Sequence, residues 1–189
     1  WVSQQLASLL ESVRQAVARS LHADPAEIML NENTTVGINV VAYGINWRAG
    51  DNVILTDHEH PGNRITWYNI AKRFGVHLRF LPLSNDPNEI LERFEALFDG
   101  RTRVASVSHV SRRTGLRLPA REMAEIARRH GAPLLLDGAQ AFGAIPVDVR
   151  DLGCDFYTCS GHKYLMAPQG TGAFYVRRDM LEWLKPSWI

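Results

Sequence analysis

The sequence has little of what would mark several classes of protein. Only two of its 189 residues are cysteines, and it contains no run of about 18 apolar residues. Its charges almost cancel, because 21 Lys and Arg stand against 20 Asp and Glu, a formal net charge of +1. The sequence therefore predicts no membrane-spanning helix and no general electrostatic attraction to nucleic acid or to an anionic membrane.

The scarcity of cysteine excludes two kinds of site. Cys154 and Cys159 are separated by four residues, but a structural zinc site needs a second pair of ligands, and the sequence has none. Two cysteines are also too few for a disulfide-stabilised scaffold. Both lie in an apolar run, so we expect small buried side chains in a protein of the reducing cytoplasm.

The remaining composition is typical of a folded domain. Hydrophobic residues make up 46% and charged residues 22%, whereas a disordered chain combines low hydrophobicity with high net charge. The first residue is Trp1 rather than Met, a helical period begins at once without a capping signal, and residues 179–189 open a new segment. We expect the central piece of a larger protein; the alternative is a complete small domain.

Strand-like and helix-like patterns alternate along the chain. The strand-like runs are 28–30, 52–56, 76–81, 103–109, 133–137, 155–160 and 172–176, and the helix-like segments are 3–21, 33–47, 63–74, 86–97 and 119–130. This alternation predicts an α/β fold with a mostly parallel sheet. In such sheets ligands bind at the carboxyl ends of the strands, so the residues that follow each strand are the candidate functional residues.

A polar turn follows the first strand-like run. Thr34 and Thr35 come directly after Asn33 at the start of a helix, where free N–H groups and the helix dipole suit a phosphate. An ordinary helix cap is the alternative interpretation. The common glycine-rich nucleotide-binding motifs are absent from the sequence.

Two histidines follow the second strand-like run. His58 and His60 alternate in an extended segment, so they could converge on a metal ion, with Asp137 or His109 as a third ligand. Surface or capping histidines are one alternative, and a flat imidazole that stacks on an aromatic cofactor is another.

An acid and a lysine follow two later strands. Asp137 ends a fully apolar run, where a buried carboxylate is costly unless a cation or a protonated ring nitrogen pairs with it. Lys163 comes after the run 155–160, close to Ser160 and His162, which makes it a candidate Schiff-base lysine. A solvated lysine in a loop is the alternative.

One cofactor, pyridoxal 5'-phosphate, needs all of these groups together. Its aldehyde needs a lysine, its phosphate a helix N-terminus with hydroxyls, its ring nitrogen an acid, its phenolic oxygen a donor and its ring a flat partner. The chain offers these groups in order: Thr34, Thr35, His60, Asp137, Gln140, Ser160, His162 and Lys163.

The same motifs resemble those of the class V aminotransferases, which are fold-type I pyridoxal-phosphate enzymes. The resemblance rests on the runs DGAQ (137–140), CDFY (154–157) and SGHK (160–163), and on NTTVGINVV, DHEHPGN and SHVSRRTG in the same order. The family includes cysteine desulfurases, isopenicillin-N-epimerase-like proteins and cysteine C–S lyases. The resemblance implies a three-layer αβα, aspartate aminotransferase-like large domain, of which residues 1–189 form part, without the N-terminal segment and the small domain. It also implies a transferase or lyase that acts on an amino acid as a homodimer.

The resemblance also implies a role for each candidate residue. Lys163 carries the cofactor as a Schiff base and later moves the α-proton of the substrate, Asp137 pairs with the ring nitrogen, and His60 stacks on the ring. Gln140 bonds the phenolic oxygen. The phosphate is held by Thr34, Thr35, Ser160 and His162.

One position departs from the desulfurase pattern. Arg112 stands where desulfurases have an asparagine, and the EHPG and APQGTG stretches are closer to the epimerase-like and C–S lyase members. Neither Cys154 nor Cys159 matches the desulfurase cysteine. Two other functions are weighed beside the family assignment: a metal-dependent hydrolase built on His58, His60 and Asp137, and a truncated, non-catalytic cofactor-binding chain.

Overall fold

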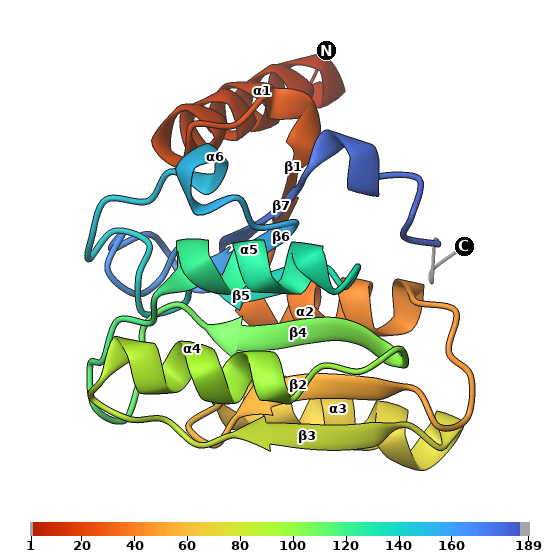
Figure 1. Cartoon of the computed structure of the whole chain (residues 1–189). Helices are drawn as coiled ribbons and strands as arrows, with labels where there is room; N and C mark the ends of the chain where they lie inside the picture. Colours follow the sequence, from red (N-terminus) through yellow and green to blue (C-terminus); the bar gives the residue numbers. More distant parts are fainter. Residues whose placement is uncertain (1, 186–189) are drawn as a thin grey trace.

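The structure, a computed structural model, describes residues 2–185 and contains a seven-stranded sheet with helices packed against it (Figure 1). The strands are β1 (Ile28–Asn31), β2 (Asn52–Thr56), β3 (His77–Leu81), β4 (Thr102–Ser108), β5 (Leu134–Asp137), β6 (Phe156–Ser160) and β7 (Gly172–Val176). The helices are α1 (Val2–Leu21), α2 (Thr34–Gly44), α3 (Pro61–Phe74), α4 (Pro87–Ala96), α5 (Ala120–Arg129) and α6 (Val149–Leu152), with 3₁₀ turns η1 (Pro25–Glu27) and η2 (Arg178–Met180). The end of the expected segment 179–189 lies outside the described residues.

The strand order is β1-β7-β6-β5-β4-β2-β3. The pairs β2–β3, β2–β4, β4–β5 and β5–β6 are parallel, whereas β7 runs antiparallel to both β6 and β1. The prediction of a mostly parallel α/β sheet is confirmed. Because β2, β4, β5 and β6 are parallel, the residues that follow them emerge at the same edge of the sheet.

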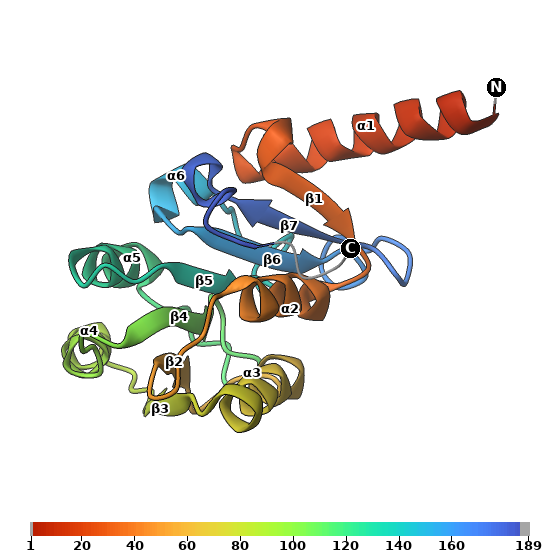
Figure 2. The ribbon, with the colours of Figure 1, turned by 90° about the vertical axis from the view of Figure 1, so that its right-hand side faces the viewer.

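The helices form a layer on each face of the sheet, as Figure 2 shows with α4 and α5 on one side and α2 and α3 on the other. The expected three-layer αβα arrangement is therefore observed. Two buried clusters fill the two interfaces. One joins Phe94 of α4 and Met123 of α5 to one face of the sheet, and the other joins Val41 of α2 and Trp67 of α3 to the opposite face.

The central strand β5 is enclosed on both faces. Leu134, Leu135 and Leu136 are fully buried, and they alternate between the two clusters. A strand covered on both sides is expected to be apolar throughout, so the sequence run 134–136 is explained by its position in the middle of the sheet.

The ends of the helices follow their capping residues. The Asn33 side chain accepts a hydrogen bond from the Val36 N–H at the start of α2, and Gly75 ends α3 in the left-handed region at φ +69°. Helix α2 ends at Gly44 rather than near residue 47, because Ile45 already has an extended backbone. The four-residue helix α6 was not predicted, since it is too short to show a helical period.

Two expectations from composition can be compared with the described residues. Cys154 and Cys159 are both free and buried, as predicted. In the part of the chain from 2 to 185, no helix combines the length and the apolar character needed to cross a membrane.

Candidate cofactor site

A cavity of about 280 Å³ lies at the carboxyl edge of the parallel strands. It is bounded by the starts of α2 and α3 and by the segments that follow β5 and β6. Its lining residues are Asn33, Thr34, Thr35, Ile38, His60, Asn63, Asp137, Ala139, Ser160, His162 and Lys163. Seven residues proposed from the sequence are therefore brought together here: Thr34, Thr35, His60, Asp137, Ser160, His162 and Lys163.

The N-terminus of α2 is fastened to the end of β6 at one side of the cavity. The Thr34 N–H donates to Ser160 Oγ at 3.1 Å, and the two hydroxyl oxygens lie 2.8 Å apart. Close packing at Gly37 makes this contact possible, because a Cβ there would lie 2.2 Å from Thr158 Oγ1. Hydroxyls and helix N–H groups are gathered at this side, which suits an anion.

An unpaired donor or acceptor lies beside these hydroxyls. In the described chain, the buried Nδ1 atom of His162 has no hydrogen-bond partner. A buried polar atom without a partner is costly, which makes this nitrogen a candidate contact for a bound ligand.

A buried acid forms another part of the lining. Asp137 ends β5, is only 5% exposed and accepts a hydrogen bond from the Ala139 N–H at 2.9 Å. Burial, with a further contribution from the charge of Glu59, raises the pKa of Asp137 to about 7. A cationic group next to Asp137 would reduce the cost of the buried carboxylate.

Lys163 is a half-buried amine in the same cavity. Burial lowers its pKa, the positive charge of Arg112 lowers it further, and Asp137 opposes both effects. A lowered pKa increases the neutral fraction of the amine, which is the nucleophilic form. The cavity therefore holds a nucleophilic amine, that of Lys163, together with the acid Asp137.

His60 caps α3 and presents its ring to the cavity. Its Nδ1 atom accepts a hydrogen bond from the Gly62 N–H at 3.0 Å, which fixes the orientation of the imidazole. Burial, Arg112 and Lys163 all lower its pKa, so the neutral ring is favoured. The absence of a side chain at Gly62 lets α3 approach α2, because a Cβ there would lie 2.6 Å from Thr35 Oγ1.

One expected site residue and one alternative from the sequence do not belong to this cavity. Gln140 does not belong to the cavity lining. His58 Nδ1 instead lies 3.2 Å from Ser111 Oγ, and within residues 2–185 no three His, Cys, Asp or Glu side chains are grouped to hold a metal ion. The alternative of a metal site built on His58, His60 and Asp137 is therefore wrong.

Some lining residues were missed by the sequence analysis. Asn33 was recognised only as a helix cap, and Asn63 only as the start of a helix; both also face the cavity. Glu59 was not proposed from the sequence and does not line the cavity, yet it is 4% exposed and accepts several hydrogen bonds. An acid between two histidines in a loop that follows a strand was the available signal.

The fold and the cavity together define a class of protein. This αβα domain places a lysine, a buried acid and a hydroxyl-rich helix N-terminus at one sheet edge, an arrangement that suits a small anionic organic molecule. The family model for class-V aminotransferases matches residues 2–189, so the chain belongs to the class-V aminotransferase family.

Individual proteins of known sequence or structure agree with this assignment. The chain is 43% identical to cysteine desulfurases of Salmonella typhimurium and Salmonella typhi over 189 residues, covering 98% of the chain and 46% of each relative. The solved complex of the cystine C–S lyase C-DES with cysteine persulfide matches with a TM-score of 0.94 at 34% identity, over 99% of this chain and 51% of the lyase. The apo cysteine desulfurase of Thermococcus onnurineus NA1 matches with a TM-score of 0.92 at 31% identity, over 100% of this chain and 48% of that one. The chain thus spans about half the length of these relatives.

Proposed function

We propose that the chain binds pyridoxal 5'-phosphate and forms the cofactor-binding part of an enzyme of the cysteine desulfurase and C–S lyase type. The observation that carries the proposal is the cavity itself, which unites Lys163, the buried Asp137 and the Thr34–Ser160 hydroxyl pair. A solved C-DES structure with glycine covalently linked to its pyridoxal-phosphate cofactor has the same fold, with a TM-score of 0.94.

The donors and acceptors of the cavity fit this cofactor. Thr34, Thr35 and Ser160 offer hydroxyl groups for its phosphate, and the unpaired Nδ1 of His162 would gain an oxygen partner. Asp137 fits a protonated ring nitrogen, because a nearby cation stabilises its buried carboxylate. Gln140 lies outside the lining, so its proposed bond to the phenolic oxygen rests on the family resemblance alone.

The chain's own side chains supply attachment, orientation and proton transfer. When bound, the cofactor supplies an electron sink for the α-carbon of an amino acid. Lys163 is the point of covalent attachment, and once it is released its neutral amine removes or returns the α-proton. Asp137 would pair with the protonated ring nitrogen, and the fixed, neutral ring of His60 would stack on the ring.

The proposed substrate is cysteine or a related sulfur amino acid. The relatives named cysteine desulfurase and the lyase solved with cysteine persulfide support this choice. Neither thiol of this chain is suited to accept sulfur, because burial raises the pKa of Cys159 to about 12 and also raises that of Cys154. C–S cleavage, epimerisation and transamination all begin from the same attachment of the amino acid to the cofactor, and the family resemblance places Arg112 where desulfurases have asparagine.

The whole enzyme is expected to extend beyond this chain. We propose that residues 1–189 form part of its large domain, that a further domain completes the substrate site, and that the full-length protein is a cytoplasmic homodimer. No nucleic acid or membrane partner is expected. On this proposal the isolated piece binds cofactor without turning over substrate.

A titration with pyridoxal 5'-phosphate tests cofactor binding. The chain is expected to develop a visible absorption band that disappears on borohydride reduction, because Lys163 attaches the aldehyde. Lys163→Ala should not develop the band, while Lys72→Ala, which removes an exposed lysine of α3, should behave as the native chain does. A band of equal intensity in Lys163→Ala would contradict the proposal.

Product analysis on the full-length protein tests the reaction. With cysteine and cystine as substrates, sulfide or persulfide should form together with alanine or pyruvate. Racemised amino acid in place of sulfur products would instead assign an epimerase-type reaction and refute the C–S cleavage proposal.

A further inference from the structure

Glu59 is a buried acid that the proposed chemistry does not use. It lies in the loop between β2 and α3, beside His60, and is 4% exposed. Its carboxyl group receives four hydrogen bonds. Oε1 accepts from Thr56 Oγ1 at 2.5 Å and from the Ser108 N–H at 3.0 Å, and Oε2 accepts from Asn63 Nδ2 and Ser108 Oγ, both at 2.8 Å.

The partners of Glu59 require an acceptor at both carboxyl oxygens. The Ser108 N–H can only donate. The Asn63 amide cannot turn round, because its Oδ1 atom already accepts from Trp67 Nε1 at 2.7 Å and from Ser106 Oγ at 3.0 Å. An amide side chain at position 59 would therefore leave a buried donor unpaired, whereas a carboxylate satisfies every partner.

These contacts link Glu59 to residues that line the cavity. Asn63 and the adjacent His60 both line the cavity. Ser108 is paired in register with Asp137 across β4 and β5, so it joins Glu59 to the strand that ends in the buried acid. One carboxyl group thus fastens β2, β4 and α3 together beneath one wall of the cavity.

Burial raises the pKa of Glu59, and the hydrogen bonds from Thr56, Ser108 and Asn63 oppose this rise because they favour the carboxylate. We propose that Glu59 is a positioning residue: its buried carboxyl group fixes the wall formed by His60 and Asn63 and, when ionised, places a negative charge close to Asp137. This inference deepens the proposed function and rests on it, because the charge favours a cationic ring nitrogen beside Asp137. Four titratable groups influence Asp137 or respond to its charge: Glu59 from the β2–α3 loop, Lys163 from the segment after β6, and Tyr157 and Cys159 from β6. Among them, Glu59 is the group whose negative charge raises the pKa of Asp137.

The test compares Glu59→Gln with the native chain in two measurements. The first is the titration midpoint of the Asp137 carboxyl group, followed by carbon NMR without cofactor. Loss of the neighbouring negative charge should lower this midpoint from about 7 by about one pH unit or more. The second is the dissociation constant for pyridoxal 5'-phosphate, which should rise about tenfold, since the wall and the charge are both changed.

A double variant separates charge from folding. In Glu59→Gln with Asn63→Asp, the bond between the two side chains reverses: the amide at position 59 donates to the carboxylate at position 63, which still accepts from Trp67 and Ser106. This variant should fold and keep the midpoint of Asp137 raised, because the pair still carries one buried carboxylate. If Glu59→Gln alone does not fold, the double variant still shows whether a buried carboxylate in this pair keeps the titration midpoint of Asp137 raised.

Two results would contradict the proposed role of Glu59. An unchanged Asp137 midpoint in folded Glu59→Gln, or a low midpoint in the folded double variant, would overturn the role of Glu59. Because the Asp137 midpoint is measured without cofactor, it does not depend on whether Lys163 carries pyridoxal phosphate. A failure of the proposed function is therefore recognised separately, by the Lys163 titration above.

Discussion

At the scale of single residues, the burial of Asp137 in the cavity costs folding free energy. A carboxyl group that ends a buried strand has an unfavourable place in the folded chain, and its pKa is raised to about 7 from an ordinary 3.8. The contribution of this group to folding is most favourable below about pH 4 and is lost as the pH rises towards 7, because only the unfolded chain ionises it freely over that range.

The loss of this contribution with rising pH predicts the behaviour of Asp137→Asn. The amide stays neutral and can still accept the Ala139 N–H, so the variant should be more stable than the native chain without cofactor. Its advantage in the free energy of unfolding should grow by about 2–3 kcal/mol between pH 5 and pH 8. Urea unfolding at both pH values measures the difference, with the exposed Glu92→Gln of α4 as the control. If the gain in the free energy of unfolding is the same at pH 5 and pH 8, burial does not raise the pKa of Asp137.

Most of the candidate residues could be predicted from the sequence, because each follows a strand or starts a helix. Thr34, His60, Asp137 and Lys163 all line the cavity as expected. The sequence shows Glu59 between two histidines after a strand, but its contacts could not be predicted, since they include a bond to Ser108, which lies 49 residues away in the sequence. Local patterns carry no information about which distant donors meet a buried acid.

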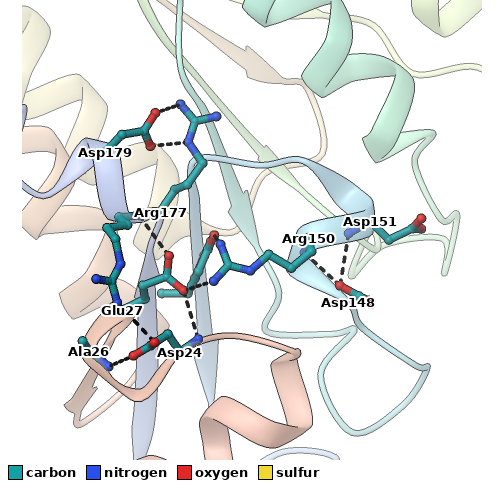
Figure 3. A network of polar contacts seen from close by, with 10 residues as sticks. Asp24, Ala26, Glu27, Asp148, Arg150, Asp151, Arg177 and Asp179 are labelled. Atoms are coloured by element: carbon teal, nitrogen blue, oxygen red, sulfur yellow. Dashed lines mark hydrogen bonds and ion pairs between the residues drawn. The ribbon is translucent and has the colours of Figure 1, made fainter.

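At the scale of elements, a second buried acid fixes the outer strand to its neighbours. Figure 3 shows Glu27, the last residue of η1, with its carboxyl group next to Arg150 of α6. The Glu27 side chain also accepts from the Asp24 N–H and the Arg178 N–H, each at 3.0 Å. One carboxyl group thereby joins η1, which leads into β1, to α6 and to the chain that leaves β7.

We expect Glu27→Ala to lower the free energy of unfolding by about 2–3 kcal/mol, because two backbone donors and one guanidinium lose their acceptor. The half-exposed position of Arg150 keeps the loss below that of a fully buried ion pair. Urea unfolding measures it, with the exposed Glu32→Ala as the control. Equal midpoints for the two variants would show that the Glu27 contacts add no stability.

Elements with strong local signals agreed well with the prediction. The Asn33 cap and the Gly75 terminus are visible in the sequence, and both mark helix ends in the structure. The helix α6 depends on the cap at Asp148 and has only four residues. Its stability comes from buried Val149 and Leu152 and from the contact with Glu27 rather than from a periodic pattern.

At the scale of the whole molecule, the site depends on contacts that join distant parts of the chain. The bond between Thr34 and Ser160 spans 126 residues, and it forms because β7 lies between β1 and β6 and runs antiparallel to both. The sequence predicted the parallel part of the sheet but not this strand order. Helix α1 extends away from the sheet in Figure 2 and exposes Leu6, Leu9, Leu10 and Val13.

The central claim is that Lys163 carries pyridoxal 5'-phosphate in the cavity at the sheet edge. The most direct measurement is borohydride reduction of the cofactor-loaded chain, followed by mass spectrometry of its proteolytic peptides. The account predicts a reduced pyridoxyl group on Lys163 and none on the exposed Lys72. A label distributed over both lysines, or no label on Lys163, would contradict it.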